Sequence, residues 1–134
     1  MTTHPVRQII EDCDRAISAG DFDAVMEYYT EDAALVIKPG MIARGKADIR
    51  KAFGLISDYF QGQLQVTQGD MQVIEGGRDA LVIMETQLKF PGPQGEPVEI
   101  SRRATYVFRK EPDGRWLCSI DNSYGTDLLD TEIA

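Results

Sequence analysis

The chain has 134 residues, of which 43% are hydrophobic and 27% are charged, and its formal net charge is −8. Such a length and composition are typical of one globular domain with one core, which we expect to span residues 1–134. The acidic balance argues against binding of nucleic acid or anionic membranes, and the absence of a long apolar run or an apolar signal segment predicts a cytoplasmic protein that does not cross a membrane.

The first half of the chain predicts three helices, with a short pair of strands between the second and the third. Apolar residues recur at helical spacing from Val6 to Ile17, and Asp21 is a good N-cap for the helix that follows. The predicted elements are a helix from Pro5 to Gly20, a shorter helix from Phe22 to Thr30, strands at 33–37 and 41–44, and a helix from Lys46 to Phe60.

The second half changes from helical to strand-like periodicity. Short turns rich in glycine and proline separate long apolar-polar runs, and Gly69 indicates a β-bulge within the first of them. The predicted antiparallel strands cover residues 63–75, 80–90, 98–110 and 116–124. Three helices followed by such strands predict an α+β fold. We expect a cone-shaped barrel, in which a strongly curved mixed or antiparallel sheet wraps around the three N-terminal helices and leaves an internal pocket.

The last predicted strand ends in polar residues, although its first part is mostly apolar. The run from Trp116 to Ile120 is followed by Asp121, Asn122 and Ser123. Polar groups in such surroundings cost free energy unless they are solvated, paired or lining a cavity. Two interpretations stay open for Asp121: it lines a ligand pocket, or it hydrogen-bonds the local backbone where the strand ends.

Four segments of the chain, in order and at matching spacing, resemble a known family. They are residues 19–23 between the first helices, 29–33 after the second helix, 44–49 at the start of the third helix, and 113–116 before the last strand. The stretch from Val6 to Leu129 is similar to the SnoaL-like branch of the nuclear transport factor 2-like superfamily, which has the cystatin-like fold and is related to ketosteroid isomerases.

The resemblance implies a cone-shaped domain and a homodimer built on the outer face of the sheet. Isomerase relatives use a carboxylate base just after the first strand and a tyrosine in the first helix. Here the first position falls in the stretch from Val36 to Pro39, which contains no acid, and the second falls near Cys13. The mechanism of the steroid isomerases is therefore not carried over to this chain.

Asp121 and an arginine are the candidate catalytic residues. Loss of solvation raises the pKa of a carboxyl group toward the range that proton transfer requires. Arg102 and Arg103 point to opposite faces of one strand, so only one of them can enter the pocket, and we choose Arg103 to hold a substrate oxygen. Glu85 is its expected partner across the sheet, in either a structural or a substrate-binding pair.

The remaining candidates form the wall of the pocket. Aromatic and methionine side chains offer apolar surface with a few polar handles. The predicted ligand-binding residues are Tyr28, Met41, Glu85, Tyr106, Trp116 and Asn122, of which Asn122 alternates with Asp121 and only one of these two can easily face the pocket. No metal site and no cofactor are expected, because His4 is the only histidine and no cofactor motif is present.

These observations favour a domain that binds a small, largely apolar molecule in its cone. Catalysis there would be acid/base chemistry without a cofactor, such as isomerisation, cyclisation or hydration. The alternative is a module for homodimeric association or ligand sensing that performs no reaction. The missing acid after the first strand favours the alternative, and a buried polar cluster at the end of the last strand would favour the enzyme.

Overall fold

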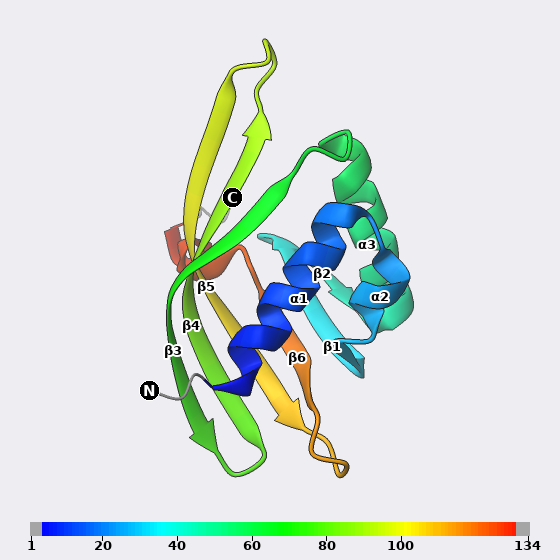
Figure 1. Ribbon diagram of the computed structural model, residues 1–134, viewed down its shortest axis with the longest axis vertical. Coiled ribbons are helices and arrows are strands. Elements are labelled where there is room, and N and C mark those ends of the chain that lie inside the picture. The colour runs from blue at the N-terminus through cyan, green and yellow to red at the C-terminus, as the bar shows by residue number, and fades with distance from the viewer. Residues whose placement is uncertain (1–3, 131–134) are drawn as a thin grey trace.

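The computed structural model describes residues 4–130 and shows an α+β domain with one mixed sheet (Figure 1). Its elements are α1 (Pro5–Ala19), α2 (Phe22–Met26), β1 (Tyr29–Lys38), β2 (Met41–Arg44), α3 (Lys46–Tyr59), β3 (Gln65–Gly76), β4 (Asp79–Pro91), β5 (Pro97–Lys110), β6 (Trp116–Asn122) and a final 3-10 helix, η1 (Gly125–Asp130). The predicted fold class is confirmed, and the element order follows the prediction closely.

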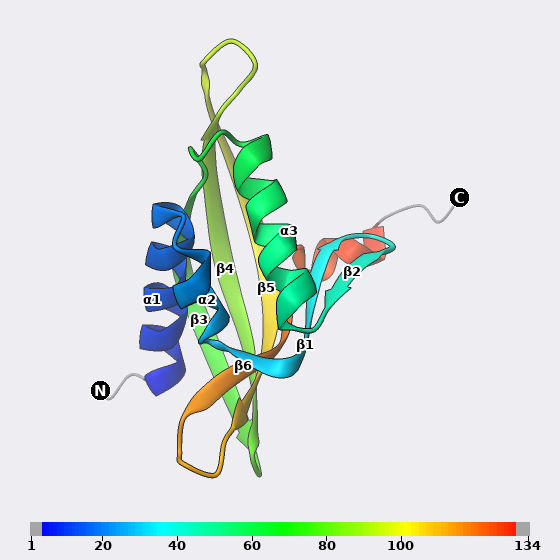
Figure 2. The ribbon, with the colours of Figure 1, turned by 90° about the vertical axis from the view of Figure 1, so that its right-hand side faces the viewer.

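The sheet has the strand order β2-β1-β6-β5-β4-β3. Neighbouring strands are antiparallel, except that β1 runs parallel to β6 (Figure 2). The register between β3 and β4 shifts between Gln68 and Met71, so the bulge predicted at Gly69 is confirmed. The sheet curves strongly but stays open, with β2 and β3 as its two edges.

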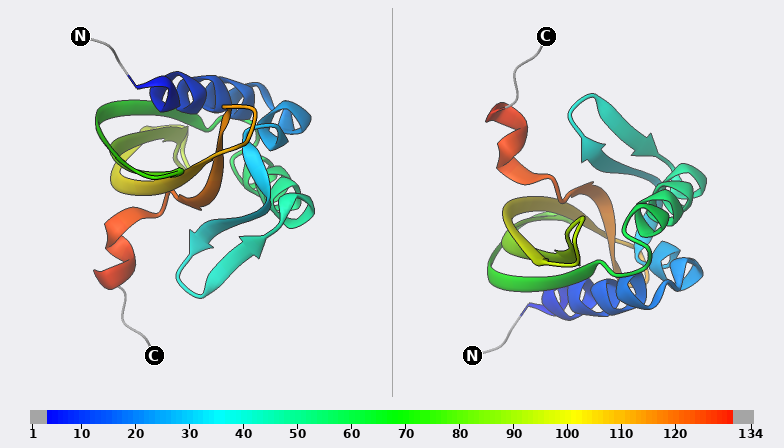
Figure 3. Two further views of the ribbon diagram at one scale, coloured as in Figure 1. Left: turned by 90° about the horizontal axis from the view of Figure 1, so that it is seen from below. Right: turned by 90° about the horizontal axis from the view of Figure 1, so that it is seen from above.

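The helices lie against the concave side of this sheet. Helix α1 packs against β3, while α3 packs against β1 and β2, and the end-on views show the strands curling around them (Figure 3). The buried stripe of α1 includes Val6, Ile10 and Cys13, and Gly20 ends the helix in the left-handed conformation with φ of 74°. None of the helices between residues 4 and 130 combines the length and the apolarity needed to cross a membrane.

The second helix is shorter than predicted. It ends at Met26, and the chain enters β1 at Tyr29 instead of continuing in helical form to Thr30. The backbone N–H of Cys118 donates to the carbonyl oxygen of Tyr28 at 2.8 Å, and Tyr29 is in register with Cys118. Pairing with β6 therefore overrides the local helical pattern. As a consequence, the Tyr29 side chain points into the core beside the end of β6.

Candidate functional site

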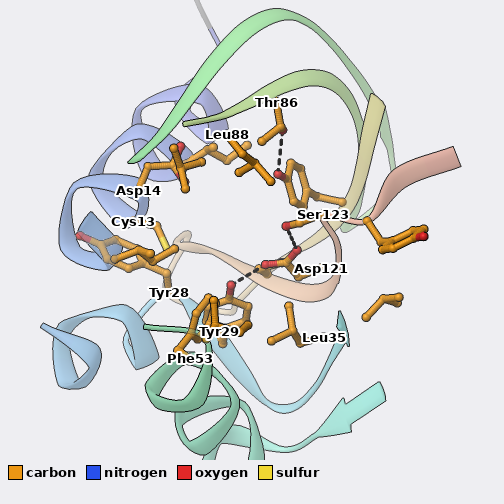
Figure 4. A pocket seen from close by; sticks show the side chains of 18 of the residues that line it. Cys13, Asp14, Tyr28, Tyr29, Leu35, Phe53, Thr86, Leu88, Asp121 and Ser123 are labelled. Carbon is orange, nitrogen blue, oxygen red and sulfur yellow. Dashed lines mark hydrogen bonds between the residues drawn. The ribbon is translucent and has the colours of Figure 1, made fainter. Parts of the chain in front are cut away.

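A cavity of about 300 Å³ lies between the helices and the concave face of the sheet. Its wall is mainly apolar, and its polar groups come from α1 and from the strands β1, β4, β5 and β6 (Figure 4). Its size falls at the lower end of the range of small-molecule sites. The lining residues are Ile9, Ile10, Cys13, Asp14, Ile17, Tyr28, Tyr29, Leu35, Val36, Ile37, Phe53, Ile56, Phe60, Leu64, Val66, Thr86, Leu88, Arg102, Tyr106, Phe108, Cys118, Asp121, Ser123 and Tyr124.

Asp121 is the most enclosed acid of the cavity, with 6% of its surface exposed. Its register with Tyr106 of β5 places it on the inner face of the sheet. One carboxylate oxygen accepts a hydrogen bond from the Tyr29 hydroxyl at 2.6 Å, and the other accepts one from Ser123 Oγ at 2.5 Å (Figure 4). Burial raises the pKa of Asp121 above its usual range, while these two donors act in the opposite direction.

Asp14 of α1 is a second buried acid in the same cavity, and 9% of its surface is exposed. Its Oδ2 accepts a hydrogen bond from Gln68 Nε2 at 2.8 Å. Burial raises the pKa of Asp14 to about 7, the hydrogen bond from Gln68 lowers it, and the charge of Asp121 raises it further. The two acids are therefore electrostatically coupled.

A series of polar side chains on the inner face of the sheet lies between the two carboxyl groups. From the Asp14 side, Gln68 accepts from Thr86 Oγ1 at 2.8 Å, and Thr86 Oγ1 lies 3.3 Å from the Tyr106 hydroxyl. Ser123 donates to Asp121, and the single hydroxyl proton of Tyr106 can be donated either to Thr86 or to Ser123. Each polar side chain in this chain of contacts has a partner, so the network fixes both acids in place within an otherwise apolar cavity.

Three of the residues predicted from the sequence lie on the cavity wall. These are Tyr28, Tyr106 and Asp121. Tyr106 is buried, and its hydroxyl belongs to the network between the two acids. Tyr28 is partly exposed and lies on the same side of the cavity as Cys13 and Asp14 (Figure 4). The structure places all three side chains at the cavity, and their roles in ligand binding or catalysis remain predictions.

The choice of Arg103 over Arg102 as the inward arginine is wrong. Arg103 lies on the outer face of the sheet, where its Nη2 is 2.9 Å from Glu85 Oε1, so Glu85 also lies outside the cavity. Arg102 lines the cavity instead. Alternate residues of a strand face the same side of the sheet, so Arg102 points inward together with the buried residues Ala104 and Tyr106.

Three other predicted wall residues lie elsewhere. Met41 is exposed in β2, at the edge of the sheet. Trp116 is buried at the start of β6, opposite the end that carries Asp121, and its ring contacts that of His4 edge-to-face. Asn122 points away from the cavity, and its amide donates to Thr105 Oγ1 at 3.1 Å. Of Asp121 and Asn122, only the former faces the cavity, as alternation requires.

Asp14 and Tyr29 are not among the site residues predicted from the sequence, and Ser123 is predicted only as part of the polar end of the last strand. A signal for Asp14 was present, because it follows Ile10 by four residues and so lies on the apolar stripe of α1. An acid on such a stripe is either unfavourably placed or functional. Tyr29 lies within the helix predicted from Phe22 to Thr30, and its contact with Asp121 depends on the parallel pairing of β1 with β6, which no local pattern indicates.

A family model described as the SnoaL-like domain matches residues 6–120. The protein Aln2 from a Streptomyces species is 14% identical in sequence, with 97% of this chain and 98% of that chain covered and a TM-score of 0.81. A nuclear transport factor 2-like protein with a cystatin-like fold from Novosphingobium aromaticivorans is 18% identical, with coverages of 92% and 86% and a TM-score of 0.77.

A third similar structure is a proposed dehydratase from the nuclear transport factor 2-like family of Streptomyces avermitilis. It is 21% identical, the aligned region covers 87% of this chain and 91% of that chain, and the TM-score is 0.74. None of the curated proteins is significantly similar in sequence. Identities this low show a shared fold and carry no assignment of activity.

Proposed function

The chain belongs to the SnoaL-like domain family, and we propose that it binds a small, largely apolar molecule in its cone and transfers protons on it without a cofactor. The observation that carries the proposal is the pair of buried carboxyl groups, Asp14 and Asp121, in a mainly apolar cavity. Buried acids with raised pKa values destabilise a fold, and they concentrate at sites where proton transfer needs them.

The two acids are suited to different roles. Asp121 accepts hydrogen bonds from two hydroxyl donors, which favour its carboxylate form, so we assign it the role of general base. Burial raises the pKa of Asp14 to about 7, so this group still carries a proton at pH values where an exposed aspartate has lost it, and we assign it the role of general acid. This pair would replace the carboxylate that isomerase relatives use near the end of the first strand, a stretch where this chain has Val36 and Ile37 of β1 in the cavity wall.

The reaction class that fits this arrangement is proton removal from a carbon next to a carbonyl group. The Asp121 carboxylate takes the proton, and the neutral Asp14 donates a hydrogen bond or its own proton to an oxygen of the substrate. In a dehydration, the C–H electron pair forms the double bond, and the hydroxyl group leaves as water with the proton of Asp14. Isomerisation requires the same two groups, and a protein of similar fold is described as a proposed dehydratase.

The buried thiols do not suit a nucleophilic mechanism. Cys13 and Cys118 both line the cavity, and both are free. Burial raises the pKa of each thiol well above its ordinary value, and the nearby Asp121 raises it further. A cysteine acts as a nucleophile through its thiolate, so both residues are neutral wall groups at physiological pH. This leaves the carboxyl groups as the reactive groups of the cavity.

Filling the cavity is expected to abolish ligand binding. Leu88 lines the cavity between Asp14 and Thr86 in Figure 4, so Leu88→Trp places an indole in the space that a ligand needs. Naphthylacetamide is a suitable neutral probe, and its binding should raise the melting temperature of the wild type. We expect the variant to lose this shift, which corresponds to an affinity at least about tenfold lower.

The matched control for this experiment is Gln87→Trp. It introduces the same side chain at the neighbouring position, which points to the outer face of β4. This control should respond to naphthylacetamide as the wild type does. Binding that persists in Leu88→Trp, or a wild type that does not respond to any concentration of the probe, contradicts a ligand site in the cone.

We further propose that the domain forms a homodimer through the outer face of its sheet. Four apolar residues lie directly opposite one another on this face, in the order Ile74, Leu81, Val107 and Ile120 across β3 to β6. Ile74, Leu81 and Ile120 are exposed in the monomer. A two-fold axis through such a row brings each apolar group against an equivalent group of the second copy, which makes the face self-complementary.

A charge in the centre of this row is expected to prevent dimerisation. Leu81→Glu would oppose two carboxylates across the two-fold axis, and sedimentation velocity should then show a monomer where the wild type is a dimer. Leu55→Glu is the matched control, because Leu55 is exposed on α3, away from the sheet face. A wild type that sediments as a monomer, or equal behaviour of the two variants, contradicts this interface.

A further inference from the structure

Arg102 gives the cavity a positive end. Among the described residues that line the cavity, it is the only one with a cationic side chain. Its Cα is in register with that of Thr86, on the inner face of the sheet. Its side chain is partly exposed, whereas Asp121 is buried. The cation therefore lies at the solvent side of the cavity, and the acids lie in its interior.

The residues after β6 hold this guanidinium in place. It lies over the ring of Tyr124, with its central carbon 4.3 Å from the ring centroid, and its Nη1 donates to Asp127 Oδ2 at 3.3 Å. The stacking fixes the plane of the group. A guanidinium has five N–H donors, so one long contact to a half-exposed carboxylate does not saturate it. Ion pairs of this exposure are weak, and another carboxylate can replace Asp127.

Tyr124 and Asp127 are held in position by a tight turn at Gly125, after the end of β6. Gly125 adopts φ of 87°, and a Cβ at this residue would lie 2.5 Å from the carbonyl oxygen of Arg103. The Asn122 side chain clamps the turn, because its Oδ1 accepts from the backbone N–H of Gly125 at 3.0 Å. The chain therefore folds back over β5 in a defined way and presents Arg102 in a fixed orientation rather than as a mobile surface cation.

We propose that the ligand carries a carboxylate at one end of an apolar body, and that Arg102 binds this carboxylate in place of Asp127. This inference rests on the function proposed above and names its substrate class. An anionic group is repelled by the interior acids and attracted by Arg102, so the charges of the cavity set the orientation of the ligand. The uncharged end of the ligand, which carries the carbonyl group, then lies against Asp121 and Asp14.

A pair of probes tests the proposal. Naphthylacetate and naphthylacetamide share one apolar body and differ in the charge of one terminal group. Isothermal titration calorimetry at low salt and about pH 7.5 should give an affinity of the wild type for the acetate that is about tenfold higher than for the amide. Because the chain carries a net charge of −8, such a preference for an anion requires a local cation.

Arg102→Gln is expected to remove this preference and to leave binding of the amide within about twofold of the wild type. Arg103→Gln is the matched control, since it removes the same charge from the adjacent residue on the outer face and should preserve the preference. Asp127→Asn removes the competing carboxylate and should raise the affinity for the acetate about threefold. The ratio of the affinity for naphthylacetate to that for naphthylacetamide is compared between variants, because a general disturbance of the pocket lowers both affinities equally.

The outcomes separate this inference from the proposed function. If the wild type binds the amide but does not prefer the acetate, or if Arg102→Gln keeps the preference, the carboxylate site is wrong and the ligand cavity stands. If the wild type binds neither probe, the ligand cavity itself is contradicted, and this inference with it. Arg102→Lys, which keeps the charge but not the fork geometry, should retain part of the preference.

Discussion

Asp121→Asn is expected to reduce proton abstraction in the cavity by at least about 100-fold, the usual contribution of a general base. Nitrobenzisoxazole is a suitable probe, because a carboxylate removes its ring C–H proton, the N–O bond breaks and a coloured cyanophenolate forms without any cofactor. The exchange replaces an ionisable oxygen by an amide that can still accept from Tyr29 and must turn its NH2 group toward Ser123. The fold should therefore persist while the base is lost.

The rate of the wild type should rise with pH as Asp121 ionises. Burial raises the pKa of this group, so the rise is expected above the pH range in which an ordinary aspartate loses its proton, near about pH 4. Asp79→Asn, which changes an exposed carboxyl at the start of β4, is the control and should leave the rate within about twofold. An unchanged rate in Asp121→Asn excludes this residue as the base.

The same assay distinguishes an enzyme from a binding module. A wild type that binds naphthylacetamide but does not accelerate the reaction of nitrobenzisoxazole over acetate buffer would have a ligand cavity without a working base. The domain would then act in ligand sensing or in association, and the buried acids would serve to orient a polar ligand group. The cavity and its network of hydrogen bonds are common to both functions, so only a rate can separate them.

The fold was predictable because its signals are local and repeated. The apolar stripe of α1, the glycine at its end and the turns between β3, β4, β5 and β6 each indicate their own element. The prediction failed where a distant partner decides the outcome. Residues 27–30 fit a helix by periodicity, but the parallel pairing of β1 with β6 converts Tyr29 and Thr30 into strand.

The site was predictable only in part, for a related reason. Asp121 could be identified as a candidate, because a carboxyl group at the end of an apolar strand costs free energy unless it is solvated, paired or lining a cavity. The inward arginine could have been identified from alternation in β5. Arg102 falls on the same face of the strand as the apolar residues Ala104, Tyr106 and Phe108, which are buried in the structure. Asp14 and Asp121 come together through the packing of α1 against the sheet, and no spacing in the sequence reports on such a contact.

Asp14→Asn is expected to stabilise the protein at alkaline pH and to flatten its pH dependence. Burial raises the pKa of Asp14 from 3.8 to about 7, so between these values the folded state holds a proton that the unfolded chain has released. The free energy of unfolding therefore decreases as the pH rises through this window. The asparagine cannot ionise and still accepts from Gln68. The variant should exceed the wild type by up to about 4 kcal/mol at about pH 8 and equal it near about pH 4.

Urea denaturation at a series of pH values measures this difference directly. Asp58→Asn removes an exposed carboxyl from α3, and its profile should run parallel to that of the wild type. A variant Asp14→Asn that also runs parallel, or that is less stable at about pH 8, shows that Asp14 does not hold a proton in the folded state and removes its role as the acid. A gain in stability together with a loss of turnover has the opposite meaning. It shows that the folded protein retains an unfavourable carboxyl because the chemistry of the cavity requires it.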